Sequence, residues 1–223
     1  MNDETDRPSA PCFAHELQQS TGGSFHLVDP QQHGDVMRWR RSERKRLIEA
    51  RLAMPAAERA AMAAEISQRL LTEIGALEGR TISFYWPLRG EPDLRALIDS
   101  VAAAGARCAL PVVVERNAPL EFHAWAPGDA LKKGFWGIPV PEAENAVLPD
   151  VILAPVVGFD AGCYRLGYGG GYFDRTLSVI AHSALVVGIG YTAARIATIF
   201  PQPHDIALDR IVTQSATLDR PAP

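Results

Sequence analysis

The chain has 223 residues, of which 47% are hydrophobic and 22% are charged, a composition typical of one soluble globular domain. Its net charge of −4 gives no overall basis for nucleic-acid binding, and no apolar run approaches the roughly 20 residues of a membrane span. The three cysteines, Cys12, Cys108 and Cys163, lie far apart, which argues against a structural zinc site or a disulfide framework and favours a reducing cytoplasm. The N-terminal sequence also lacks the basic segment and apolar core of a secretory signal.

The first segments predict an extension followed by a basic helix. Residues 1–36 are polar and lack sustained periodicity, so we expect them to be irregular. Residues 38–53 predict a helix with seven basic and two acidic side chains, and Arg40 and Arg44, four positions apart, share one face of it. The pair suits either a clamp for a polyphosphate or a solvated basic face with weak affinity for RNA.

Strand and helix signals then alternate, which predicts an α/β sheet fold. We expect further helices at residues 55–75, 92–104 and 172–181, with weaker helical signals at 191–200, and strands at 82–86, 107–114, 120–125, 151–153, 184–189 and 210–213. Glu91 lies on a strand-to-helix loop, where α/β sheets place ligand contacts. Tyr85 suits the strand core, and Trp136, on a proline-stiffened loop, suits either the core or a stacking surface for a planar ligand.

A glycine-rich loop between a strand and a helix is the strongest functional signal. Glycines at 167, 169, 170 and 171 let backbone N–H groups crowd a ligand, and the helix that follows adds unpaired donors, so the segment suits a phosphate. It matches neither the P-loop pattern nor the dinucleotide pattern, because no lysine follows the glycines and Tyr172 replaces the third glycine. Arg165, Asp174 and Arg175 flank the loop, which a mere turn does not require. A catalytic thiol at Cys163 is a further alternative.

His204 and Asp205 lie in a proline-rich loop near the end of the chain. Two interpretations fit them equally well. They could form a simple cap, or Asp205 together with Asp174 could supply hard oxygen ligands to Mg²⁺.

Five segments, in the same order, resemble the 5-formyltetrahydrofolate cyclo-ligase family, also called methenyltetrahydrofolate synthetases. RLGYGGGYFDR (Arg165–Arg175) resembles that family's R-L-G-x-G-x-G-Y-[YF]-D-R loop. The other matching segments are YWPLRGEPDL (Tyr85–Leu94), WGIPVP (Trp136–Pro141), APVVGFD (Ala154–Asp160) and PHDIALDRIVTQ (Pro203–Gln214). The resemblance implies a three-layer α/β fold with a mostly parallel sheet and helices on both faces, similar to the sugar-isomerase and CoA-transferase group.

The resemblance also implies ATP-dependent cyclisation of 5-formyltetrahydrofolate to 5,10-methenyltetrahydrofolate, with Mg²⁺. It assigns ATP contacts to Arg40, Arg44, Arg165, Gly167, Tyr168, Gly169, Gly170, Gly171, Tyr172 and Asp174, and a catalytic role to Arg165, Tyr172 and Asp174. It assigns folate contacts to Tyr85, Glu91, Trp136 and Tyr172, and the metal to Asp174 and Asp205. The expected protein is a cytoplasmic monomer that binds a reduced folate and ATP, with no membrane or nucleic-acid partner.

The chain departs from the family pattern at several positions. Arg40 replaces a frequent lysine, Tyr168 and Gly170 replace basic residues found in some members, and Phe173 lacks a tyrosine hydroxyl. Two alternatives therefore stay open: a divergent paralogue that uses ATP on another small substrate, and an RNA- or partner-binding protein that uses the basic helix. The expected domains are an extension at 1–36, one α/β domain at 37–215 and a tail at 216–223.

Overall fold

The computed structural model describes residues 30–180 and 184–222 of the chain. Its helices are α1 (Pro30–Ala53), α2 (Ala56–Ile74), α3 (Arg95–Ala103) and α4 (Tyr172–Ile180), with 3-10 turns at Phe135–Gly137 and Thr192–Ala194. Its strands are β1 (Thr81–Ser83), β2 (Arg107–Val112), β3 (Glu121–Ala124), β4 (Leu131–Lys133), β5 (Pro139–Pro141), β6 (Val151–Pro155), β7 (Gly158–Phe159), β8 (Arg165–Leu166), β9 (Leu185–Ile189), β10 (Arg210–Val212) and β11 (Thr217–Asp219). No helix within these ranges has both the length and the apolar character needed to cross a membrane.

A seven-stranded sheet in the order β11-β10-β9-β6-β1-β2-β3 forms the centre of the fold. The strands from β10 through β2 run parallel to one another, and β11 and β3 add antiparallel edges. The predicted, mostly parallel α/β sheet is therefore confirmed, and β2 and β3 form an antiparallel pair.

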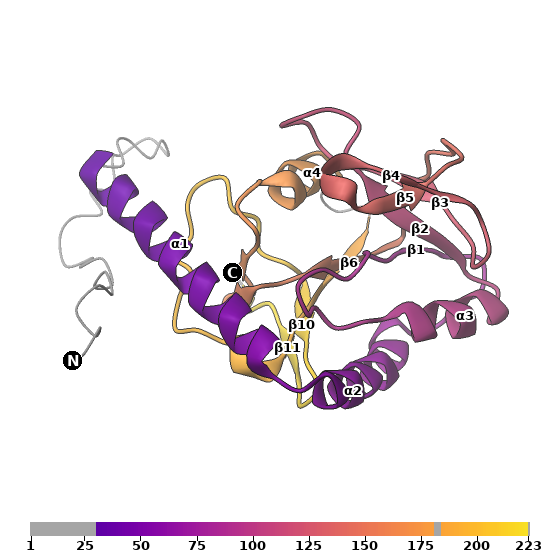
Figure 1. Ribbon diagram of the computed structural model, residues 1–223, viewed down its shortest axis with the longest axis horizontal. Helices are drawn as coiled ribbons and strands as arrows, with labels where there is room; N and C mark the ends of the chain where they lie inside the picture. The colour runs from indigo at the N-terminus through magenta and orange to yellow at the C-terminus, as the bar shows by residue number, and fades with distance from the viewer. Residues whose placement is uncertain (1–29, 181–183, 223) are drawn as a thin grey trace.

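Helices cover both faces of this sheet, as the alternation of buried side chains along the strands requires. Leu153 of β6 and Leu110 of β2 pack in the same core as α2 and α3, whereas their neighbours Ile152 and Ala109 pack in the core that contains Leu177 of α4. Figure 1 shows α2 and α3 on one side of the sheet and α4 on the other. The expected three-layer architecture is confirmed.

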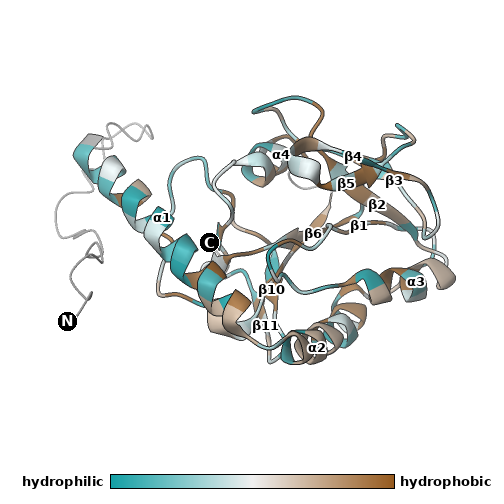
Figure 2. Ribbon diagram, viewed as in Figure 1, coloured by the Kyte–Doolittle hydropathy of each residue, from teal (hydrophilic) through white to brown (hydrophobic). Residues whose placement is uncertain are grey.

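Helix α1 lies against the loops at the ends of the strands rather than on either face of the sheet (Figure 1). Leu47 and Ile48, near its carboxyl end, pack with Val157, Leu166 and Ile199 in a small separate core. Figure 2 shows the corresponding change along α1 from hydrophilic to hydrophobic residues. Long Arg, Lys, Glu and Leu side chains favour the helix, and it ends at Ala53 because the residue before Pro55 disfavours helical geometry.

Several predicted boundaries differ from the structure. Residues 30–36 belong to α1, so the expected irregular extension is wrong over that part, and residues 1–29 lie outside the described residues. The expected tail at 216–223 contains β11, which pairs with β10 and gives that strand a second neighbour. Between 191 and 200 only the turn Thr192–Ala194 is helical, because the Ile199 amide donates to the buried Asp160 carboxylate and holds the rest in a loop.

Candidate functional site

The loops that follow three neighbouring parallel strands meet at the carboxyl ends of these strands. Strand β1 leads to the segment Leu88–Glu91, β6 leads through the β7–β8 hairpin to the glycine loop Gly167–Gly171, and β9 leads to residues 190–206. Parallel α/β sheets bind ligands outside the carboxyl ends of their strands, so this is where a ligand is expected. The carboxyl-terminal half of α1 packs beside these loops.

The glycine loop offers a run of unused backbone donors. None of the amides from Gly167 to Gly171 donates a hydrogen bond to another described residue. The carbonyls are used instead: Arg44 Nε donates to the Gly167 oxygen at 2.5 Å, and Arg175 Nη2 donates to the Gly170 oxygen at 2.6 Å. Two of the loop carbonyls are thus held by arginines while the amides stay available, which is the arrangement that an anion requires.

Arg44 adds positive charge that no carboxylate of the described residues neutralises within ion-pair distance. Burial lowers the pKa of this guanidinium, and the neighbouring charge of Arg40 lowers it further. A partly buried arginine without a counter-ion, beside unpaired amides, favours the binding of a negatively charged group such as a phosphate.

Two ion pairs hold the aspartates of the site. Arg165 makes a parallel fork to Asp174, with Nη1–Oδ1 and Nη2–Oδ2 distances of 3.0 and 3.1 Å, and only 4% of its side chain is exposed. Arg40 pairs with Asp205 and also donates to the carbonyls of Ile199 and Phe200, which fixes α1 to the loop after β9.

The two predicted metal ligands are adjacent, but they do not form a complete metal site by themselves. The Ile206 amide donates to Asp174 Oδ1 at 3.3 Å, which brings the backbone next to Asp205 against Asp174. The described residues contain no group of three or more His, Cys, Asp or Glu side chains placed to hold a metal ion. Because Mg²⁺ is commonly held by one or two carboxylates together with substrate phosphates, this donor set fits Mg²⁺ only in the presence of a nucleotide.

Glu91 is a buried carboxylate with one free oxygen. Its Oε2 accepts a hydrogen bond from the Leu88 amide at 2.8 Å, whereas its buried Oε1 has no partner among the described residues. Burial raises the pKa of Glu91, and the Leu88 amide, the Arg51 charge and the nearby Tyr168 hydroxyl act in the opposite direction. A buried acceptor without a donor is the group that a ligand N–H would satisfy.

Of the four predicted folate contacts, Tyr85 belongs to the main hydrophobic core. Its side chain is only 5% exposed within the main core, and its hydroxyl donates to the Pro92 carbonyl at 2.7 Å. The structure therefore places Tyr85 as a core residue beneath the loop that carries Glu91, because the pleat of the chain after β1 points its ring inward.

Trp136 and Tyr172 form an aromatic pair beside the glycine loop. Their ring centroids are 5.5 Å apart in an edge-to-face arrangement, and Trp136 is 68% exposed. The backbone of Trp136 has a φ of 55°, an uncommon conformation for a bulky residue. An exposed tryptophan in a strained backbone, held against an aromatic of the adjacent helix, suits a surface for a planar ligand.

Three observations concern residues whose roles the sequence left open or did not indicate. Cys163 is fully buried, and burial raises its pKa to about 11, so a catalytic thiol there is not supported. The Tyr168 hydroxyl contacts Arg51 and Leu88, although 40% of the residue stays exposed. Arg51 is a buried polar residue that the motifs did not single out, although its position seven residues after Arg44 places both on one helical face.

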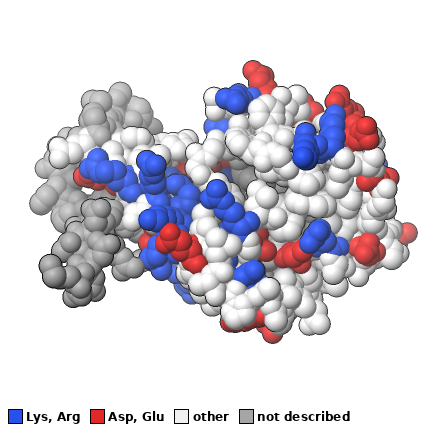
Figure 3. Space-filling view, viewed as in Figure 1, with Lys and Arg blue, Asp and Glu red and all other residues white. Residues whose placement is uncertain are grey.

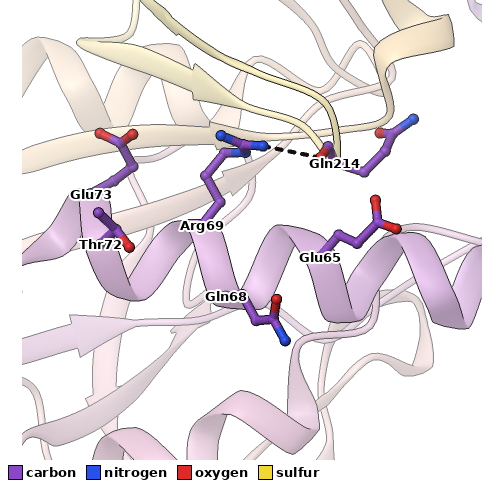
Figure 4. Close-up of a pocket in the computed structure, with 6 residues that line it drawn as sticks. All are labelled: Glu65, Gln68, Arg69, Thr72, Glu73 and Gln214. Carbon is purple, nitrogen blue, oxygen red and sulfur yellow. Dashed lines mark hydrogen bonds between the residues drawn. The ribbon is translucent and has the colours of Figure 1, made fainter.

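A surface cavity of about 440 Å³ lies elsewhere in the molecule. Figure 4 shows its lining residues along α2 and at the turn before β11, which are Glu65, Gln68, Arg69, Thr72, Glu73 and Gln214. Arg69 donates to the Gln214 carbonyl at 3.3 Å across it. It contains none of the groups described above and we assign it no role in the site.

Gly169 also lies against the Arg44 guanidinium. It has a φ of 94°, and a Cβ at this position would lie 3.4 Å from the Arg44 guanidinium. We expect Gly169→Ala to lower the free energy of unfolding by about 1–2 kcal/mol through backbone strain, and to raise the nucleotide KM about tenfold by displacing Arg44.

The matched control is Gly128→Ala, because Gly128 has a φ of 97° and nothing within 4 Å of an added Cβ. Urea unfolding of both variants should show similar losses, while steady-state kinetics should show a raised nucleotide KM for Gly169→Ala alone. Equal KM values for the two variants would contradict the role assigned to Arg44.

Comparison with known proteins identifies the family. The model of the 5-formyltetrahydrofolate cyclo-ligase family matches residues 36–214. The chain is 34% identical over 146 residues to a 5-formyltetrahydrofolate cyclo-ligase of Mycolicibacterium smegmatis, covering 61% of this chain and 75% of the relative. It is 30% identical over 172 residues to that of Escherichia coli, covering 74% and 94%.

A solved structure agrees with this match. The 5,10-methenyltetrahydrofolate synthetase of Aquifex aeolicus superposes with a TM-score of 0.72 at 26% identity, covering 82% of this chain and 94% of that one. Sequence family and fold agree, and the chain therefore belongs to the 5-formyltetrahydrofolate cyclo-ligase family.

Proposed function

We propose that this protein converts 5-formyltetrahydrofolate to 5,10-methenyltetrahydrofolate and cleaves ATP to ADP and phosphate in the same reaction. The formyl oxygen attacks the γ-phosphorus of ATP, so that an O–P bond forms and the bond to ADP breaks. The neighbouring folate nitrogen then attacks the formyl carbon and gives up its proton to the departing phosphate as the C–O bond breaks. Phosphorylation is needed first because a formamide oxygen is a poor leaving group.

The observation that carries this proposal is the pairing of unused amides with an uncompensated arginine at the glycine loop. Phosphoryl transfer depends mainly on positioning and on neutralising charge. The amides from Gly167 to Gly171 and the guanidinium of Arg44 would hold the β- and γ-phosphates. Arg40 would contribute from the same helical face, and Arg165 would orient Asp174 through the fork that they form.

Asp174 and Asp205 would hold Mg²⁺ together with the phosphate oxygens. The metal would supply positive charge that neutralises the negative charge developing on the phosphates. Both carboxylates are paired with arginines, so we propose that nucleotide binding redistributes these pairs.

The folate would lie between two groups on either side of the glycine loop. Glu91 Oε1 offers an acceptor to the N–H groups of the pterin, and Trp136 with Tyr172 offers an aromatic surface. Tyr172, the first residue of α4, adjoins both the loop and this surface, which supports its assignment at the reacting centre.

The test is the absorbance of the methenyl-folate band with purified protein, 5-formyltetrahydrofolate and Mg-ATP. We expect the band to grow only when ATP is present. Absence of the band, with a melting temperature that ATP still raises, would favour a paralogue that acts on another small substrate. Absence of both responses would overturn the site.

The alternative of RNA binding by α1 receives less support. Figure 3 shows basic side chains gathered along this helix. However, Arg40 and Arg51 are buried against the fold, and three outward residues are paired locally with acidic neighbours. Those pairs are Arg38 with Asp35, Lys45 with Glu49 and Arg46 with Glu43. We further propose a cytoplasmic location, because three widely spaced cysteines suit a reducing compartment.

A further inference from the structure

Arg51, in the last turn of α1, joins three segments that are distant in the sequence. Its Nε donates to the Arg89 carbonyl at 2.9 Å and its Nη2 to the Tyr168 hydroxyl at 2.8 Å. Its Nη1 makes a longer contact of 3.5 Å to the Val156 carbonyl at the end of β6. The residue is 6% exposed. A buried guanidinium held mainly by backbone carbonyls and a phenol stabilises the segments that supply those oxygens.

Tyr168 carries this link into the glycine loop. Its hydroxyl accepts the hydrogen bond from Arg51 and donates to the Leu88 carbonyl at 3.4 Å. The Arg89 guanidinium also lies 5.8 Å from the centre of its ring. The side chain of the second loop residue is thus held against the segment Leu88–Glu91, so the position of one loop depends on the position of the other.

The segment Leu88–Glu91 needs such support because its backbone is strained. Arg89 has a φ of 46°, which is uncommon for a residue other than glycine, and its carbonyl is the group that Arg51 Nε holds. The Leu88 amide in turn holds Glu91 Oε2. Arg51 and Tyr168 therefore fix the backbone that aims the Glu91 carboxylate.

We propose that Arg51 and Tyr168 are positioning residues that couple the glycine loop to the segment Leu88–Glu91, so that a nucleotide bound at the loop raises the affinity for the reduced folate. This inference rests on the proposed function. A phosphate held by the loop amides fixes Tyr168, and Tyr168 with Arg51 then fixes the segment that orients Glu91. By thermodynamic linkage the folate raises the affinity for the nucleotide by the same factor.

The experiment measures folate affinity by titration calorimetry with and without a saturating non-hydrolysable ATP analogue and Mg²⁺. In the unaltered protein we expect the analogue to tighten 5-formyltetrahydrofolate binding at least about fivefold. Tyr168→Phe deletes only the hydroxyl, and we expect it to bring this factor close to one. Arg51→Lys keeps the charge but loses the planar fork, and we expect the same loss of coupling.

Tyr191→Phe is the matched control, because the Tyr191 hydroxyl donates to the Gly90 carbonyl at 3.2 Å and has no contact with the glycine loop. It should change folate affinity equally with and without the analogue and so preserve the factor. A factor that survives in Tyr168→Phe, or is absent from the unaltered protein while both ligands bind, overturns the coupling alone. Failure of the unaltered protein to bind 5-formyltetrahydrofolate under either condition overturns the proposed function and this inference together.

Discussion

Asp174→Asn is expected to lower turnover by about 100- to 1,000-fold, the range typical of losing one group that stabilises charge in a transition state. The substitution keeps the shape of the side chain but removes the charge that Arg165 and the proposed Mg²⁺ both require. It also leaves a guanidinium that is only 4% exposed without its counter-ion, so the free energy of unfolding should fall by about 3–5 kcal/mol. Methenyl-band kinetics and urea unfolding measure the two effects separately.

The control for this change is Asp219→Asn, which breaks an ion pair with Arg210 whose aspartate is 70% exposed. Exposed pairs contribute about 0–1 kcal/mol, so neither turnover nor stability should change appreciably. If Asp174→Asn loses stability but keeps turnover within about tenfold, then Asp174 is a structural partner of Arg165 and not a group on which the chemistry depends.

The sequence predicted best those parts of the site that depend on local geometry. The glycine loop and the start of α4 follow from the conformational freedom of glycine and the unpaired amides of a helix end, which are properties of consecutive residues. Arg40 and Arg44 share a helical face by their spacing alone. In the structure Arg44 contacts the loop directly, and Arg40 is joined to it through Asp205 and Ile206, whose amide contacts Asp174.

The contacts that the sequence did not predict are long-range ones. Tyr168 meets Leu88 at a separation of 80 positions and Arg51 at 117, and these contacts exist only once α1 has packed on the β7–β8 hairpin. The sequence also did not determine on which face of the sheet the Tyr85 side chain lies. A strand that is covered on both faces is apolar throughout, so it lacks the alternation of polar and apolar residues that would indicate the buried face. The burial of Tyr85 is a consequence of the helices on both sides of the sheet, which no single strand encodes.

Glu91→Gln is expected to separate folate binding from stability. Burial is the largest influence on the Glu91 carboxyl and raises its pKa, so the folded protein holds a proton there at pH values where the unfolded chain has released it. The contribution of Glu91 to stability is therefore fully present below 4.5, the pKa of this carboxyl in the unfolded chain. This contribution is lost as the pH rises from 4.5 through the raised pKa of the folded state. Glutamine cannot ionise, so the variant should lack this pH-dependent loss.

At neutral pH we expect Glu91→Gln to be at least as stable as the unaltered protein, yet to show a folate KM about 10- to 100-fold higher because a charge-assisted hydrogen bond is worth about 1.5–3 kcal/mol. Urea unfolding at several pH values and methenyl-band kinetics measure the two quantities. Glu78→Gln, at an exposed position, should leave both unchanged. An unchanged folate KM in Glu91→Gln would remove Glu91 from the folate site. A stability profile that still declines with pH as in the unaltered protein would instead show that another group titrates in this range.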